Sequence, residues 1–277
     1  MLRRLWLSVQ RWRWPSRWAI KCGFVGAVVF FTLYPRPGLF VRHIGHLGDM
    51  NALVEPDSPA LQPWAAELAA IIPADADDET LRQAVEAFVV EKVCYAFDWV
   101  TWGAMDYLPT VAEVVAQGRE DCDGRAVVAA SLLRRYDPTA ALATDFKHMW
   151  VVTATGSLMR PSGPTVLVAT PIGLRTDWLR ALNVRGLAYG IAVFPLWRQM
   201  IIFVAVWLAL CDPRMRPGFA FVAALVAVHG LLVVRLAAVD PWQPRMWGIW
   251  LGLAQVAVVV VLVVSAARQA RQQRAAM

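Results

Sequence analysis

A single cysteine lies among acidic residues in the stretch GREDCDGRAVV. The residues that follow, DGRAVVAASLLRRYDP, predict a helix that ends at Asp137-Pro138, so Cys122 falls at a helix start. Backbone N–H groups and the helix dipole favour negative charge there, and the thiolate is the attacking form of cysteine. Three flanking acids oppose this unless they point outward, cap the helix or pair with arginine: Glu120, Asp121 and Asp123. We predict that Cys122 is a nucleophile.

A nucleophilic thiol needs a base, and His148 in FKHMWVV is the best candidate. It lies on a predicted strand, on the same face as Trp150 and Val152, and a strand beside a helix start can bring imidazole to thiol. His43 and His46 in VRHIGHLGD are the alternatives, and with Asp49 they could bind a metal. Their segment has no clear helical pattern, so we expect solvated loop residues there, and we predict no metal site and no organic cofactor.

The other cysteines fit a structural role better. Cys22 and Cys211 fall inside apolar runs, where a thiol behaves as a small hydrophobic group. Cys94, in EKVCYAFDW, is expected on a buried helix face. A Cys94–Cys122 disulfide in an oxidising compartment is the alternative.

The middle of the chain, residues 36–185, has the composition of one soluble domain, with frequent charges and no long apolar run. The stretch from Pro35 to Pro63 is rich in Pro, Gly and Asp and predicts a linker with irregular packing. Two helices are then predicted, in DADDETLRQAVEAFVVEK and in PTVAEVVAQG. In the second, Thr110 and Glu113 can form a capping box at the start, and Gly118 is expected to end the helix. ALATDFKHMWVVTATG and TVLVATP then predict antiparallel strands, which makes the domain α+β.

The two ends of the chain hold the excess of apolar residues, since 58% of residues are hydrophobic and the mean hydropathy is +0.47. We predict transmembrane helices at residues 19–35, 187–210, 219–239 and 247–264. Pro195 and Arg198 interrupt the second, which is either a kinked span or an interfacial helix leading into a short one. His229 lies within a predicted span, where a hydrogen bond inside the helical bundle is expected rather than a proton relay.

Arginines border these apolar runs, and their distribution predicts the topology. The basic N-terminus (residues 1–18), the turn between the second and third spans, and the tail (residues 265–277) share one side if there are four spans. By the positive-inside rule that side is the cytoplasm, so residues 36–185 are expected outside, as in a bacterial inner-membrane protein. The net charge of +6 is explained by this arrangement rather than by nucleic-acid binding. A transporter would need more charged residues within the spans.

The stretch GREDCDGRAVVAASLLRR, followed by KHMWVV, resembles the core of the transglutaminase-like superfamily, whose fold is related to the papain-like cysteine peptidases. The resemblance covers about Val93 to Pro171, with a domain core at 75–171. It implies a catalytic Cys122 and His148 and an aspartate on the next strand that orients the histidine. This sequence reads VLVATP at that point, so Thr170 occupies the position of the third residue, and Asp145 and Asp177 are the alternatives for that role.

The resemblance implies attack on an amide or peptide bond through a thioester, with hydrolysis favoured over transfer to an amine. Its substrate would be a protein or peptide, such as a cell-envelope protein, and the bilayer is the other partner. The alternative is a degenerate domain that binds a peptide or wall component without catalysis, which the loss of the aspartate favours. Trp99 and Trp102 either line a substrate channel or belong to the core.

Overall fold

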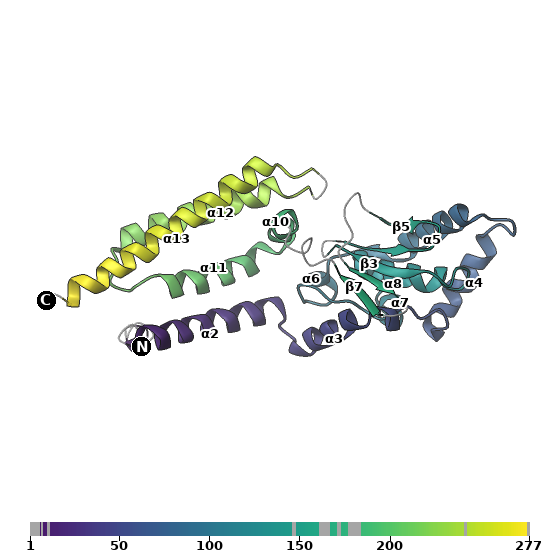
Figure 1. The fold of residues 1–277 in the computed structure, drawn as a ribbon, viewed down its shortest axis with the longest axis horizontal. Coiled ribbons are helices and arrows are strands. Elements are labelled where there is room, and N and C mark those ends of the chain that lie inside the picture. Colours follow the sequence, from purple (N-terminus) through teal and green to yellow (C-terminus); the bar gives the residue numbers. More distant parts are fainter. Residues whose placement is uncertain are drawn as a thin grey trace. The chain divides into compact units, whose positions relative to one another are not determined.

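The computed structural model describes residues 6, 8–9, 12–145, 148–160, 167–170, 173–176, 184–240 and 243–275. The chain divides into two compact units, Arg36–Asn183 and the combination of Met1–Pro35 with Val184–Met277 (Figure 1). Most of the described secondary structure is helical, and the sheets are small. The N-terminal and C-terminal apolar helices therefore flank a mixed α/β middle region, as the sequence predicts.

Three helices of the terminal unit are long and apolar enough to cross a membrane. They are α2 (Trp14–Leu33), α12 (Pro217–Ala237) and α13 (Met246–Ala275), the last over Met246–Gln272. The predicted spans at 19–35, 219–239 and 247–264 fall on these helices. The candidate spans agree with the prediction that this is an integral membrane protein.

The predicted span at 187–210 is broken into two helices. α10 (Val184–Val193) and α11 (Leu196–Leu210) meet at an angle of 112°. Pro195 precedes α11 and cannot donate a backbone hydrogen bond to the end of α10. Arg235 of α12 donates instead to the carbonyls that the break leaves, at 3.1 Å to Ile191 and 2.6 Å to Phe194. The described helices therefore supply three spans, or up to four if the bent pair crosses.

Polar contacts join three helices at one end of the terminal unit. Lys21 of α2 donates to the carbonyl of Ala209 at 2.6 Å, near the end of α11. Just beyond α11, the buried Asp212 forms an ion pair with Arg271 of α13 at 3.4 Å. The end of α11 thus lies beside the first half of α2 and the last part of α13.

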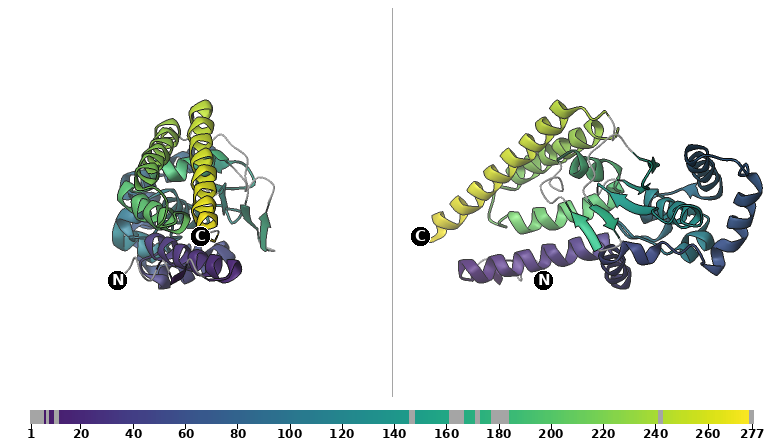
Figure 2. Two further views of the ribbon diagram at one scale, coloured as in Figure 1. Left: turned by 90° about the vertical axis from the view of Figure 1, so that its left-hand side faces the viewer. Right: turned by 45° about the vertical axis from the view of Figure 1, so that its right-hand side comes forward.

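The helices α12 and α13 lie side by side (Figures 1 and 2). Their backbones come close together at Gly230 and Gly252, where a Cβ added to Gly230 would lie 2.9 Å from the carbonyl oxygen of Gly252. Only glycine permits such a close contact between the two backbones.

The middle unit is built around an antiparallel sheet of five strands in the order β5-β4-β3-β6-β7. The strands are β3 (Ala141–Thr144), β4 (Met149–Val152), β5 (Ser157–Leu158), β6 (Leu167–Thr170) and β7 (Gly173–Thr176). A second, parallel pair joins β1 (Cys94–Tyr95) to β2 (Arg119–Glu120). The predicted order of helices first and strands second agrees with this arrangement, apart from the two short strands among the helices.

The central helix of the middle unit is α8 (Cys122–Leu133). From Ala126 to Leu133 every residue is buried, and the helix packs against β4 and against α5 (Asp78–Lys92). Asp121 caps its start, because its side chain accepts a hydrogen bond from the backbone N–H of Asp123 at 3.1 Å. The fold therefore fixes the first turn of α8 through both its cap and its apolar face.

The helix before Cys122 is α7 (Val111–Gln117), and its ends are those that the sequence predicts. Thr110 and Glu113 form a capping box. Gly118 ends the helix with φ of +62°, a conformation that glycine adopts without strain. The turn that delivers Cys122 is therefore encoded locally.

The prediction of a linker from Pro35 to Pro63 is wrong. The segment contains α3 (Pro37–Gly48) and the 3-10 helices η1 (Met50–Leu53) and η2 (Pro59–Leu61), followed by α4 (Gln62–Ile71). Pro37 is tolerated because it falls in the first turn of α3. Met50, Leu53 and Leu61 lie in the main core. Prolines in this segment, which suggest a loop in the sequence, lie in the first turns of α3, η2 and α4.

Candidate active site

Cys122 is the first residue of α8, as predicted. Its thiol donates to Oδ1 of Asp123 at 3.3 Å, and the backbone N–H of Met149, the first residue of β4, lies close enough to the sulfur to lower the pKa of the thiol. His148 is the residue immediately before Met149. The fold therefore brings the nucleophile candidate to the backbone next to the candidate base.

The environment of Cys122 favours the neutral thiol. Burial raises its pKa well above the usual range, and the carboxylates of Asp123 and Asp121 raise it further, while the Met149 N–H opposes them weakly. Asp123 does not point away from the thiol, because its side chain accepts the thiol's hydrogen bond. The expectation that the helix start favours a thiolate is outweighed here by burial and by neighbouring charge.

Several contacts with described residues hold His148. Its backbone N–H donates to Oδ1 of Asp145 at 2.9 Å, and its ring stacks on Trp150 with an interplanar angle of 15°. Its Nε2 lies 2.8 Å from the carbonyl oxygen of Met159, which can only accept a hydrogen bond. Nε2 must therefore carry the proton in this contact, and Nδ1 is the basic nitrogen.

The residue that holds the ring, Met159, has an unusual backbone conformation. Its φ is +59°, and among the described residues it is the only one other than glycine with a positive φ. Met159 follows β5 directly. Backbone strain of this kind persists where the surrounding structure requires it, and here it accompanies the carbonyl contact to His148.

Thr170 is not brought to the same end of the sheet as His148. The register pairs Thr144 of β3 with both Met149 and Leu167, and Thr170 lies three residues beyond Leu167 along β6. At about 3.3 Å per residue this is roughly 10 Å along the strand. The side chain of Thr170 lies outside the described residues, as does all of Asp177. Among the described residues, the carbonyl of Met159 contacts the imidazole.

A buried group of carboxylates adjoins Cys122, and its members come from two separate parts of the chain. Asp98, the first residue of α6 (Asp98–Thr101), and Glu120 are both buried, and Asp121 is half-buried. Oxygens of these three side chains lie within 4.8 Å of one another. The side chains of Asp121, Cys122 and Asp123 form a second group that meets the same limit. Asp98 is far from Glu120 and Asp121 in the sequence, so no local sequence motif predicts this cluster.

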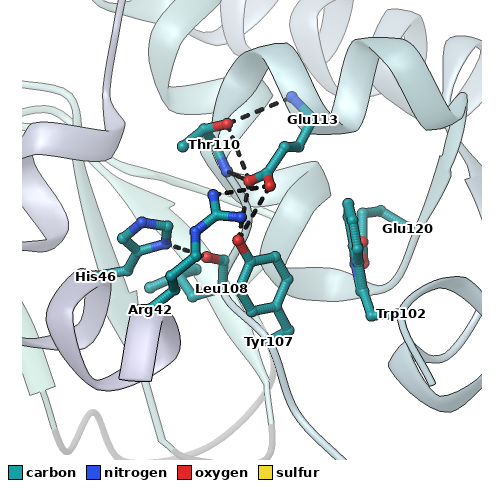
Figure 3. A network of polar contacts seen from close by, with 8 residues as sticks. All are labelled: Arg42, His46, Trp102, Tyr107, Leu108, Thr110, Glu113 and Glu120. Carbon is teal, nitrogen blue, oxygen red and sulfur yellow. Dashed lines mark hydrogen bonds and ion pairs between the residues drawn. The ribbon is translucent and has the colours of Figure 1, made fainter. Parts of the chain in front are cut away.

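The loop from Trp102 to Leu108 connects this cluster to α3 (Figure 3). The Trp102 indole donates to Glu120, and the Tyr107 backbone N–H donates to Oδ2 of Asp98 at 2.5 Å. Trp102 is therefore a buried polar partner, whereas Trp99 stacks on Phe97 with ring centroids 4.2 Å apart. Of the two predicted roles for these tryptophans, Trp102 agrees with the core role.

The prediction of solvated loop residues is wrong for two histidines, of which Figure 3 shows His46. His43 and His46 lie on α3, not in a solvated loop. His43 is buried and its Nδ1 accepts from the Leu108 N–H at 3.2 Å, while His46 Nδ1 lies 2.6 Å from the Leu108 carbonyl. Their i, i+3 spacing places both on the face of α3 that holds the loop.

The same face of α3 carries Arg42, which forms an ion pair with Glu113 at 2.8 Å (Figure 3). Glu113 also accepts from the hydroxyl of Tyr107 and from the backbone and hydroxyl of Thr110. One carboxylate thus ties α3, the loop and the start of α7 together.

The cysteines differ from prediction in one respect. Cys94 is exposed on β1, not buried on a helix face. All four cysteines are free thiols, so the alternative of a Cys94–Cys122 disulfide is not the state of this structure.

Comparison with known proteins gave no match to a family model, to a curated protein or to a solved structure.

Proposed function

We propose that the middle unit is a transglutaminase-like cysteine enzyme anchored in a membrane. It acts on amide or peptide bonds through a thioester on Cys122, with His148 as the base and hydrolysis favoured over transfer to an amine. The observation that carries this proposal is the contact of the Cys122 sulfur with the Met149 N–H, directly beside His148. A thiol at a helix start and a histidine at the start of an adjoining strand are the two parts that such chemistry needs.

The reaction begins with a neutral thiol, because the surroundings of Cys122 disfavour the thiolate. Nδ1 of His148 takes the thiol proton while the sulfur attacks the carbonyl carbon. The C–N bond then breaks, and His148 gives its proton to the leaving amine or ammonia. Water adds to the thioester, which releases the acid and restores the thiol. In this scheme His148 works as a general base at the moment of attack.

The Met159 carbonyl orients the imidazole of His148, a function for which the family resemblance implies an aspartate. It holds the Nε2 proton, so the other ring nitrogen is left basic. A carbonyl orients the ring but stabilises imidazolium less than a carboxylate does. The alternative function, a binding domain without catalysis, is favoured by this weaker third member and by the neutral thiol.

The first experiment compares iodoacetamide labelling of the full chain in detergent at pH 7, measured cysteine by cysteine with mass spectrometry. The variants are Cys94→Ser and His148→Ala, and the exposed Cys94 of the unmodified chain is the internal reference. We expect His148→Ala to lower the labelling rate of Cys122 about tenfold or more and to leave the rate of Cys94 unchanged. A Cys122 labelling rate that does not change in His148→Ala would overturn the enzyme proposal.

The second experiment supplies an acyl donor. A mixture of glutamine-containing peptides is incubated with the protein, with and without hydroxylamine, and ammonia and hydroxamate are measured. Ammonia without hydroxylamine indicates hydrolysis, and hydroxamate indicates a thioester open to amines. Both products should disappear in Cys122→Ser. If neither product forms at all, the binding alternative replaces the enzyme.

We further propose four crossings, with both termini in the cytoplasm of a bacterium and the middle unit outside the inner membrane. The arginine-rich N-terminus, the turn after α11 and the tail are the positive segments. Support comes from the contacts of Lys21 with Ala209 and of Asp212 with Arg271, which gather these three segments at one end of the terminal unit. α11 then crosses as a short helix, and α10 lies at the opposite end.

A further inference from the structure

Four basic side chains gather at one end of the terminal unit. Arg17 and Lys21 lie one helical turn apart on α2, and Arg268 and Arg271 lie one turn apart on α13. Lys21 and Arg271 are close enough to repel each other, and Arg17 repels both of them. Arg268 also repels Arg271. Two helices that are far apart in the sequence thus bring like charges together.

One carboxylate lies within this basic group. The buried Asp212, just beyond α11, forms the ion pair with Arg271, and its Oδ1 accepts from the backbone N–H of Arg214 at 3.1 Å. The terminal unit contains only one other acidic residue, Asp240, which lies beyond the far end of α12. One negative charge against four positive charges leaves the group strongly positive.

Lys21 carries a buried charge that no acid neutralises by contact. The residue is 2% exposed, and its ammonium group donates to the carbonyl of Ala209 at 2.6 Å. It also lies 5.5 Å and 5.4 Å from the ring centroids of Trp6 and Trp18. Carbonyls and aromatic faces attract a cation, but no carboxylate among the described residues forms an ion pair with Lys21. A buried charge without a counter-ion costs free energy.

Two arginines of the group have guanidinium groups available to a ligand. In the part of the chain that the structure describes, the side chains of Arg17 and Arg268 form no hydrogen bond and no ion pair. Arg268 is exposed and Arg17 is half-buried. Nearby, the buried Nε of Arg214 has no hydrogen-bond partner. The group therefore has unused donors as well as an excess of positive charge.

We propose that this basic group binds the phosphate of an anionic phospholipid, with Arg17 and Arg268 as its principal ligands. A phosphate accepts several hydrogen bonds from guanidinium groups and supplies the missing negative charge. The group lies where α2 begins and where the apolar part of α13 ends, which is the level of the headgroups if these helices span a bilayer. Trp6 and Trp18 beside Lys21 also suit the membrane interface.

The test measures lipid binding to the full chain in dodecyl maltoside, an uncharged detergent, by native mass spectrometry. Phosphatidylglycerol and the zwitterionic phosphatidylcholine are added at equal concentrations. We expect saturable binding of phosphatidylglycerol and several-fold weaker binding of phosphatidylcholine, whose choline group brings a positive charge to the site. Arg17→Gln and Arg268→Gln should each weaken binding of phosphatidylglycerol about fivefold. Arg245→Gln removes the same charge at the other end of α13 and should leave binding unchanged.

The thermal midpoint distinguishes a lipid headgroup from free phosphate. Phosphatidylglycerol should raise the midpoint of the unsubstituted chain, and inorganic phosphate at matched ionic strength should not. An equal rise with inorganic phosphate would assign the site to a soluble anion and overturn the proposal. Equal binding of the two lipids would also overturn it, as would phosphatidylglycerol binding that is unchanged in both arginine variants. None of these measurements depends on Cys122, so their outcome is independent of the proposed enzyme activity.

Discussion

A cysteine surrounded by carboxylates is held neutral, and this sets what the residues around it must do. Burial, Asp123 and Asp121 raise the pKa of Cys122, and together they outweigh the Met149 N–H, which lowers it. His148 must therefore remove the thiol proton while the sulfur attacks the carbonyl carbon. For this transfer the orientation of the imidazole ring matters more than its charge. That orientation depends on the carbonyl of Met159.

Substitution of Met159 tests this dependence, because its φ of +59° suits glycine better than any other residue. We expect Met159→Gly to keep the Cys122 labelling rate and Met159→Val to lower it several-fold. The β-branched side chain should also destabilise the unit by about 1–3 kcal/mol. Equal labelling rates in the two variants, measured with iodoacetamide at pH 7, would show that the carbonyl does not position the ring.

At the scale of elements, Glu113 joins α3 to the loop that reaches the acidic cluster. Burial alone would raise its pKa, but the Thr110 N–H and the Arg42 guanidinium outweigh burial and the net pKa falls below the ordinary 4.5. A depressed pKa means that the stabilisation is complete above pH 4.5 and is lost as the pH falls through the lower, folded value.

The corresponding prediction compares thermal unfolding of the full chain in detergent between pH 7 and pH 3. Glu113→Gln should be less stable than the unsubstituted chain at pH 7, by about 1–3 kcal/mol, since hydrogen bonds to a charged group are lost. The difference should shrink below pH 4.5. Glu91→Gln, on the exposed surface of α5, is the matched control. A difference that stays constant down to pH 3 would contradict the role of ionised Glu113.

The helix pair α12–α13 gives a second prediction at this scale. A Cβ at Gly230 would meet the Gly252 carbonyl at 2.9 Å, whereas one at Gly26 of α2 would meet nothing within 4 Å. We therefore expect Gly230→Ala to lower the stability of the detergent-solubilised protein by about 1–3 kcal/mol. Gly26→Ala should leave stability unchanged or raise it, as alanine favours helix. Unfolding in a denaturing detergent, followed by circular dichroism, measures both.

For the whole molecule, topology reporters fused to each end distinguish four crossings from three. If α11 crosses, reporters at the N-terminus and the C-terminus both show cytoplasmic activity. If the bent pair α10–α11 returns to the side from which it came, the C-terminal reporter lies outside. We expect the cytoplasmic result at both ends, because the alternative would export the arginines after α11 and in the tail.

The sequence predicts the parts of this molecule that depend on local patterns. Apolar length identified the helices that can span, and Thr110, Glu113 and Gly118 identified the ends of α7. The helix of His43 and His46 was missed, because its prolines and glycines stand at its ends and its packing comes from contacts with Leu108, 62 and 65 residues away.

The site was predictable to the same extent. Cys122 at the start of α8 follows from its own neighbours in the chain. The contact of His148 with Met159 depends on the turn after β5, and the approach of Asp98 to Glu120 depends on the pairing of β1 with β2. Neither leaves a sequence pattern, since each joins residues that only the folded chain brings together.

The middle unit is continuous with the terminal unit at both of its ends, at Pro35–Arg36 and at Asn183–Val184. A single proteolytic cut in either connection would leave it tethered, so its release requires two cuts. Because the terminal unit holds the candidate membrane spans, the middle unit stays attached to whatever membrane they cross. A substrate carried in the same bilayer would meet it at a far higher local concentration than one free in solution.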